Sequence, residues 1–355
     1  MAASGPAGRR GGDGQAPVLL WHADPVLGDP DDDYAAAALR ALSDEGAAVL
    51  AGVVVNRRPV EVRAAHFPSV LAALGVHRGG VPVPVGTRSG TVGRPMPPVH
   101  PGVPRVPAPP PAEGRQLQAR LLGAAADGSV TVLVTTALTD LDWLLSAHPE
   151  LVRAKVRAIV MMSDARAGGP PGSGAPWVPG DAANNLTDPG AAARVFACLQ
   201  EPAWSHVAVG VVSRWAVLGA GEAAPAFLDR LAAASPVAAW LRDRAGASMN
   251  ERWASFCRGE VPGRSRQGFV AAHLGGRDPG RAAGEPVFDL VAGVPLYDVV
   301  AAIAAVEPGW FRPEPGQRAP GFSVTGASPA VTGVRDPAGL RERMAGLLLH
   351  GFGAV

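Results

Sequence analysis

The segment "HADPVLGDPDDDYAAAALRAL" (residues 22–42) carries five aspartates between an apolar run and an alanine-rich run. The apolar residues 16–22 predict a buried strand, because the run is short and continuous. Residues 32–46 predict a helix, since alanine and leucine dominate them and a glycine ends them. The aspartates therefore gather at one strand-to-helix turn, where their charges repel one another.

Strand-like and helix-like patterns alternate along most of the chain. Continuous apolar strands separated by helices are typical of a parallel sheet that is covered on both faces. We therefore predict an α/β fold with a doubly wound, mainly parallel sheet flanked by helices. The predicted strands are residues 16–22, 47–56, 81–86, 128–136, 155–162 and 205–213. The predicted helices are residues 32–46, 60–75, 137–152, 188–200, 222–258 and 294–306.

Two segments rich in glycine and proline, residues 86–114 and 163–187, predict long loops. Proline lacks the backbone donor that a helix interior or a central strand needs. Residues 259–287 are also predicted to be irregular. Residues 1–15 are polar and glycine-rich and predict a disordered tail, which leaves residues 16–355 as a single α/β domain.

The bulk composition argues against several classes of partner. The chain has 355 residues and a formal net charge of +1, so no global field favours nucleic acid or an anionic membrane. No apolar segment is long enough to cross a bilayer. Cys198 and Cys257 give neither a metal-ligand spacing nor a disulfide framework, which fits a reducing cytoplasm. We therefore expect a cytoplasmic protein with a small-molecule ligand.

Polar residues follow the predicted strands, at the edge where parallel α/β sheets bind their ligands. Carboxylate and carbonyl oxygens are the ligands that Ca²⁺ prefers. One or two aspartates are explained equally well as helix caps that offset the helix macrodipole. Five within ten residues repel one another unless a cation is bound. The polar residues at this edge are Asp24, Asn56, Thr136, Thr139, Ser163, Asp164 and Ser213.

Five segments, in this order, resemble the nucleoside hydrolases of the inosine–uridine-preferring type. The first is "DPVLGDPDDDYAAAALRAL", which is similar to the N-terminal aspartate signature of that family. The others are "TTALTDLDWLL", "VRAIVMMSDA", "NNLTDPGAAARVF" and "VPLYDVVAAIAAVEP". Together they span more than half of the chain, so the resemblance implies the fold of that family and, more weakly, its activity.

The resemblance implies a Ca²⁺ ion at the strand ends. Asp24 would be a ligand and also the base that deprotonates a metal-bound water. Asp32 would be a second ligand, although the run of three aspartates at 31–33 leaves the register open by one residue. Thr139 would supply a backbone carbonyl, and Asp298 the final carboxylate.

The resemblance also implies contacts to a ribosyl substrate. Asn56 and Asn184 match positions that hold the sugar, although Asn184 could equally be a turn residue. Tyr297 stands where the family often has a histidine associated with the leaving base, and it could instead be a core residue. Trp177 could stack on a base, or could simply anchor its loop. Members of the family are commonly dimers or tetramers, which implies a homo-oligomer.

Several positions depart from the pattern of the family. His22 replaces its first aspartate, Ala182 replaces a glutamate, and Ser163–Asp164 replace a Gly–Gly turn. Carboxylates around a sugar suit a transition state with positive charge at the anomeric carbon. We therefore expect a Ca²⁺-dependent hydrolase of the N-glycosidic bond of a ribonucleoside or a related ribosyl compound. The alternative is a non-catalytic member that binds a ligand or a partner.

Overall fold

The computed structural model describes residues 16–25, 30–76, 80–90, 114–170, 173–260, 265–315, 321–328 and 330–354. The predicted tail at 1–15, Asp29 and most of the predicted loop at 86–114 lie outside these residues. The assignment of residues 16–355 to one domain stays a prediction.

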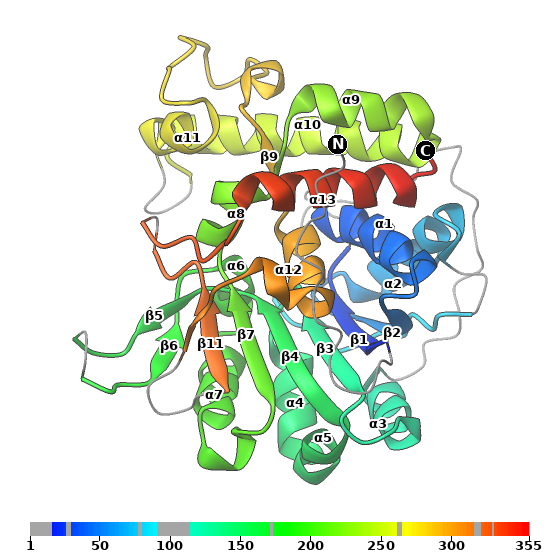
Figure 1. Cartoon of the computed structure of the whole chain (residues 1–355). Coiled ribbons are helices and arrows are strands. Elements are labelled where there is room, and N and C mark those ends of the chain that lie inside the picture. Colours follow the sequence, from blue (N-terminus) through cyan, green and yellow to red (C-terminus); the bar gives the residue numbers. More distant parts are fainter. Residues whose placement is uncertain are drawn as a thin grey trace.

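A seven-stranded sheet forms the centre of the structure (Figure 1). Valine, leucine and isoleucine dominate its strands because helices cover both faces. Six strands run parallel and only the edge strand β10 is antiparallel, which confirms the doubly wound, mainly parallel fold. In spatial order the strands are β2 (Val49–Val55), β1 (Val18–Ala23), β3 (Val130–Val134), β4 (Val156–Met162), β7 (Ala208–Val212), β11 (Phe322–Thr325) and β10 (Glu314–Pro315).

Two helical layers enclose the sheet, each with its own apolar cluster. The layer below the sheet in Figure 1 contains α3 (Gly114–Ala124), α4 (Thr139–Ala147), α5 (Pro149–Lys155) and α7 (Pro189–Leu199). The opposite layer contains α1 (Asp31–Asp44), α2 (Val60–Ala73), α12 (Tyr297–Val306) and α13 (Pro337–Gly351). Beyond it lie α8 (Arg214–Ala220), α9 (Pro225–Ala234), α10 (Pro236–Cys257) and α11 (Arg266–His273). Among the described residues, no helix combines the length and the apolar character that crossing a membrane requires.

The predicted strand at 81–86 is wrong. This segment runs along β2, where the carbonyls of Pro82 and Pro84 accept bonds from Val53 and Val55. Only Val85 forms a bridge, to Val55, because the two prolines have no backbone N–H with which to continue a ladder.

The predicted loop at 163–187 also differs from the structure. It contains a hairpin of β5 (Ala165–Ala167) and β6 (Trp177–Pro179), followed by the short helix α6 (Ala183–Thr187). A second small antiparallel pair, β8 (Glu222–Ala223) and β9 (Val294–Pro295), precedes α9 and α12. These short elements are set by tertiary contacts rather than by a local pattern.

The direction of the chain reverses between β1 and β3. From β1 it moves to β2 on one side, and it later enters β3 on the other side of β1. Ligands of open α/β sheets bind at the carboxyl ends of strands beside such a switch point. Asp24 and Thr135 directly follow β1 and β3, so the topology predicts a ligand site at these two strand ends.

Candidate active site

Three carboxylates meet beside the switch point. Asp31 and Asp32 lie in the first turn of α1, and Asp298 lies in the first turn of α12. Each offers an oxygen within 4.8 Å of the other two. The three residues are nearly buried, with exposed fractions of 8%, 3% and 4% in that order. We refer to Asp31, Asp32 and Asp298 as the acidic cluster.

The electrostatics of the acidic cluster are unfavourable for three charged carboxylates. Burial raises the pKa of Asp32 well above its ordinary value, and the nearby charges of Asp24 and Asp31 raise it further. Burial likewise raises the pKa of Asp298 well above its ordinary value, with Asp31 and Asp32 adding to the effect. The N-termini of α1 and α12 relieve part of this repulsion through their positive dipole ends. A bound cation or a proton would relieve the rest.

Hydrogen bonds hold Asp32 in place from two strands. The Thr135 hydroxyl lies 2.7 Å from Asp32 Oδ1, and the Trp21 indole donates to that hydroxyl at 2.8 Å. The backbone N–H of Asp24 donates to Asp32 Oδ2 at 3.0 Å. The two oxygens of Asp32 are therefore bonded to the residues that follow β1 and β3.

The Asp24 carboxylate is paired with two arginines. Arg57 Nη1 lies 2.9 Å from Asp24 Oδ2, and Arg63 Nη1 lies 3.7 Å from the same oxygen. Arg63 is buried and also donates to the backbone carbonyls of Asp24 and Pro25. Arg57 directly follows Asn56 and has a φ of 68°, which is uncommon for a residue with a Cβ. The structure thus places Asp24 beside the acidic cluster while its side chain forms ion pairs.

The donor set of the acidic cluster fits a hard divalent cation. Ca²⁺ takes oxygen ligands at 2.3–2.6 Å, so two ligands of one ion lie no more than about 5.2 Å apart. The separations within the cluster satisfy this limit. Carboxylates are also the ligands that Mg²⁺ uses, so the cluster fits either ion by its chemistry.

Thr135, which was not predicted, contacts the acidic cluster through the bond of its hydroxyl to Asp32. Thr139 is the first residue of α4, and its hydroxyl donates to Asp188 at 2.9 Å. A carbonyl at this position accepts a hydrogen bond within its own helix. Asp188 is the N-cap of α7 and accepts from Ala191 N–H at 3.0 Å.

The two predicted sugar-binding asparagines lie at the same edge of the sheet. Asn56 is fully buried, and its amide bonds to the Ala137 carbonyl at 3.0 Å and to the Thr136 hydroxyl at 2.6 Å. Asn184 is half-buried and donates to the carbonyls of Thr135 and Met162, so it joins the ends of β3 and β4. Both asparagines therefore fix loops next to the acidic cluster.

Tyr297 and Trp177 have different surroundings. Tyr297 begins α12 directly before Asp298 and is half-buried against the apolar cluster of the α1 layer. Trp177 lies in β6 and packs against the apolar cluster of the opposite layer, while its backbone bonds to the Gln200 side chain. These contacts agree with the role of a loop anchor for Trp177.

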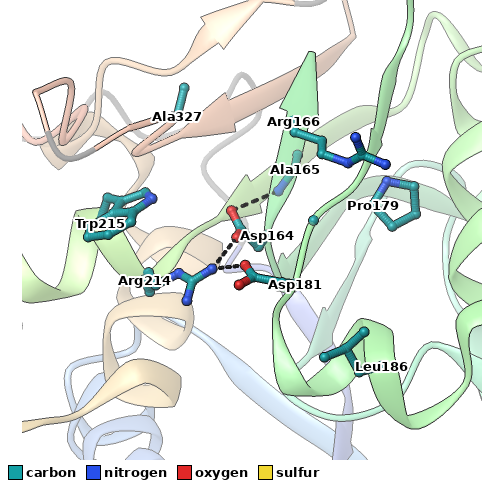
Figure 2. Close-up of a pocket in the computed structure, with 10 residues that line it drawn as sticks. Asp164, Ala165, Arg166, Pro179, Asp181, Leu186, Arg214, Trp215 and Ala327 are labelled. Carbon is teal, nitrogen blue, oxygen red and sulfur yellow. Dashed lines mark hydrogen bonds and ion pairs between the residues drawn. The ribbon is translucent and has the colours of Figure 1, made fainter. Parts of the chain in front are cut away.

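A cavity of about 400 Å³ opens at the carboxyl end of β4. In Figure 2 the Arg214 guanidinium faces both Asp164 and Asp181, and Trp215 lies on the same side as Arg214, at the left. Arg214 Nη2 donates to Asp164 Oδ2 at 2.8 Å and also pairs with Asp181. Burial raises the pKa of Asp164, and the charge of Arg214 opposes that effect. Adjacent strands are about 4.8 Å apart, so this cavity lies roughly 10 Å along the sheet edge from the end of β1.

A family model described as inosine-uridine preferring nucleoside hydrolase matches residues 24–334. The chain belongs to this family. The match confirms the family that the five segments indicated, and it includes Asp24, the acidic cluster and the cavity. A search of curated proteins returns no match.

Solved structures show the same nucleoside hydrolase-like fold. The type III effector protein XopQ, solved with adenosine diphosphate ribose, is 22% identical over 95% of both chains with a TM-score of 0.75. A purine-preferring ribonucleoside hydrolase from Gardnerella vaginalis is 14% identical, with a TM-score of 0.63 over 95% of this chain and 100% of that one. A plant nucleoside hydrolase is 17% identical, with a TM-score of 0.59 over 96% and 99%. At these identities the likeness establishes the fold.

Proposed function

We propose that this protein hydrolyses the N-glycosidic bond of a ribonucleoside or a related ribosyl compound, with a divalent cation in the acidic cluster. The observation that carries the proposal is the convergence of Asp31, Asp32 and Asp298 within 4.8 Å at the switch point of the sheet. Buried carboxylates at this spacing repel one another when they are charged, and a bound cation removes that repulsion. We propose Ca²⁺ as that ion, because the three carboxylates suit its preference for several oxygen ligands.

The chain's own residues would have three roles in this reaction. Asp24, at the end of β1, would accept the proton of the attacking water. Asn184 would position the ribose between the ends of β3 and β4. The acidic cluster would stabilise positive charge at the anomeric carbon. When bound, the cation supplies a nucleophile at neutral pH by lowering the pKa of a coordinated water.

Tyr297 and Asn56 complete the proposed site. The Tyr297 hydroxyl lies on the first turn of α12 and would donate a proton to the leaving group. Asn56 would contact the sugar from the end of β2. We propose Trp177 only as a support for the loop that precedes Asn184, because its ring packs against the opposite apolar cluster.

One observation favours a second function, the binding of a ribosyl ligand without hydrolysis. Asp24, the proposed base, forms ion pairs with Arg57 and Arg63, so its carboxylate is already engaged by two guanidinium groups. XopQ, one of the structural neighbours, was solved with adenosine diphosphate ribose. A ligand of that kind, with a ribosyl group and a diphosphate, is the candidate for this second function.

The test measures released ribose and ligand binding in parallel. Wild type, Asp298→Asn and Asp243→Asn would be stripped with a chelator and supplied with Ca²⁺, ribonucleosides and adenosine diphosphate ribose. Asp243 is the matched control because its side chain is 76% exposed. Ribose release that falls at least 100-fold in Asp298→Asn, but not in Asp243→Asn, supports hydrolysis. Saturable binding of a ligand without ribose release supports the second function. If the wild type neither releases ribose nor binds a ligand, the proposal is overturned.

A further inference from the structure

The Asp24 carboxylate is paired with arginines and is not part of the group of three carboxylates beside it, as far as the described residues go. Its backbone N–H bonds to Asp32, so the residue itself stands beside the acidic cluster. The three residues that offer oxygens within 4.8 Å of one another are nevertheless Asp31, Asp32 and Asp298. The Asp24 carboxylate instead contacts Arg57 at 2.9 Å. A cation in the cluster and the guanidinium of Arg57 therefore compete for one carboxylate.

We propose that Arg57 is a latch that withholds Asp24 from the cation, and that releasing it turns a three-carboxylate site into a four-carboxylate site. This inference rests on the proposed function, because it assumes that the acidic cluster binds a divalent cation. It concerns a residue that holds Asp24, so Arg57 is a positioning residue rather than a catalytic one.

The two arginines that face Asp24 differ in their freedom to move. The Arg63 side chain is 4% exposed and is held by the carbonyls of Asp24 and Pro25, which fix it to the strand end. The Arg57 side chain is 37% exposed, and among the described residues its side chain bonds to Asp24. Arg63 therefore belongs to the framework, whereas Arg57 can leave for solvent by breaking one bond within the part of the chain that the structure describes.

The charges are consistent with a latch. Asp24 and the acidic cluster carry four negative charges when ionised, and Arg57 and Arg63 contribute two positive charges. One divalent cation balances the remaining two. Removal of Arg57 leaves Asp24 available as a fourth ligand and also removes a positive charge that repels the cation. The additional ligand and the lost repulsion both strengthen cation binding. A variant without the Asp24 carboxylate separates them, because only the lost repulsion then remains.

The experiment is a double-mutant cycle in which Ca²⁺ affinity is measured by calorimetry. The four proteins are wild type, Arg57→Ala, Asp24→Asn and the double variant, each stripped with a chelator. Arg57→Ala is expected to raise the Ca²⁺ affinity at least 10-fold in the wild-type background and less than threefold when Asp24 is asparagine. Arg58→Ala is the matched control, because Arg58 is exposed and adjacent, and its charge acts on Glu61. It is expected to change the affinity less than threefold.

The outcomes distinguish this proposal from the one on which it rests. Equal gains from Arg57→Ala in both backgrounds would mean that Arg57 acts only through its charge, which overturns the latch. No gain in either background overturns it as well. If none of the proteins binds Ca²⁺, the cation site and the latch both fail. Arg57→Lys, which keeps a charge that can pair with Asp24, is expected to bind Ca²⁺ like the wild type, and circular dichroism of all variants checks that they fold.

Discussion

Asp298 is brought within reach of Asp31 and Asp32 by the packing of α12 against α1, and a side-chain hydrogen bond links it to Asp31. Each carboxylate is nearly buried, and the neighbouring charges that raise the pKa of Asp32 and of Asp298 are negative. Such a group of residues destabilises the folded protein when no counter-ion is present. The acidic cluster is therefore the place where a single substitution is most informative about ion binding.

We expect Ca²⁺ to stabilise the wild type and to have no effect on Asp298→Asn. At 100 times its dissociation constant, a ligand that binds only the folded state contributes about 2.7 kcal/mol, which raises the melting temperature. Asp298→Asn removes one buried charge, so this variant should melt at a higher temperature than the wild type in cation-free buffer. Differential scanning calorimetry with and without Ca²⁺ measures both effects. A wild-type response to Ca²⁺ in the variant would contradict this interpretation.

The sequence identified the residue types of the site better than it identified their partners. A run of three aspartates at 31–33 cannot reveal which side chains face the strand ends, because that depends on where α1 begins. Thr135 was not predicted, since the sequence does not reveal which of the adjacent hydroxyls of Thr135 and Thr136 faces Asp32. Arg57 and Arg63 were not predicted at all. The signal for Arg57 was its position two residues after the end of β2, beside β1, which ends directly before Asp24.

At the scale of single elements, α7 begins at a cap that also joins two helices. The Asp188 side chain accepts from Ala191 N–H and from the Thr139 hydroxyl, so it connects α7 to the start of α4. We expect Asp188→Ala to lower the free energy of unfolding by about 1–2 kcal/mol, because an orphan N–H of the helix and a hydroxyl both lose a partner. Urea denaturation measures this loss. Asp188→Ser, which can still cap the helix, should recover most of it, and an equal loss in both variants would exclude capping as the cause.

The β8–β9 pair contains a glutamate that opposes folding at neutral pH. Burial raises the pKa of Glu222 from 4.5 to about 7, and the charge of Arg341 only partly offsets this effect. Because the folded state holds its proton up to a higher pH than the unfolded state, stability falls as the pH rises from 4.5 to 7. Glu222→Gln removes this dependence. It should stabilise the protein at pH 8 relative to wild type, by about 1 kcal/mol after solvent screening of this half-buried group.

Thermal melts between pH 5 and 8 measure this difference between Glu222→Gln and the wild type. The matched control is Glu150→Gln, since the Glu150 side chain is 85% exposed. The control should follow the wild-type pH dependence. A constant offset between Glu222→Gln and wild type at every pH would contradict the assigned pKa.

Most strands and helices with a continuous apolar run or an alanine-rich run appear close to their predicted bounds, because burial between two layers requires that composition. Two long predicted helices are wrong: residues 137–152 divide into α4 and α5, and residues 222–258 contain α9 and α10. In both cases a proline begins the second helix, where it lacks the N–H that a continuous helix needs. The helix α3 was missed since its sequence, "GRQLQARLLGA", buries only a few residues. The β5–β6 hairpin was missed because three-residue strands have too few positions to show alternation.

At the scale of the whole molecule, the last helix connects the two helices that carry the acidic cluster. Arg343 on α13 bonds to Glu45, which follows α1, and to Glu307, which follows α12. The cluster lies at the opposite ends of the same two helices. Arg40 on α1 also donates to the Gly351 carbonyl at 2.9 Å. The position of α13 therefore controls the alignment of α1 and α12, and with it the spacing of the carboxylates.

We expect Gly351→Ala to weaken both the fold and cation binding, although residue 351 is remote in sequence from the acidic cluster. A Cβ at this position would collide with the backbone carbonyl of Ala37 in the middle of α1, and a backbone group cannot rotate away. Such overpacking costs about 1–3 kcal/mol, measured by urea denaturation. Because α1 must shift, the Ca²⁺ affinity should fall about 10-fold in calorimetry, as 1.4 kcal/mol corresponds to a factor of 10. Gly346→Ala in the same helix is the matched control, since a Cβ there meets no described atom within 4 Å. It should stabilise the protein by about 0.8–1 kcal/mol through helix propensity and leave the affinity unchanged. A stable Gly351→Ala with normal affinity would mean that α13 does not align the site.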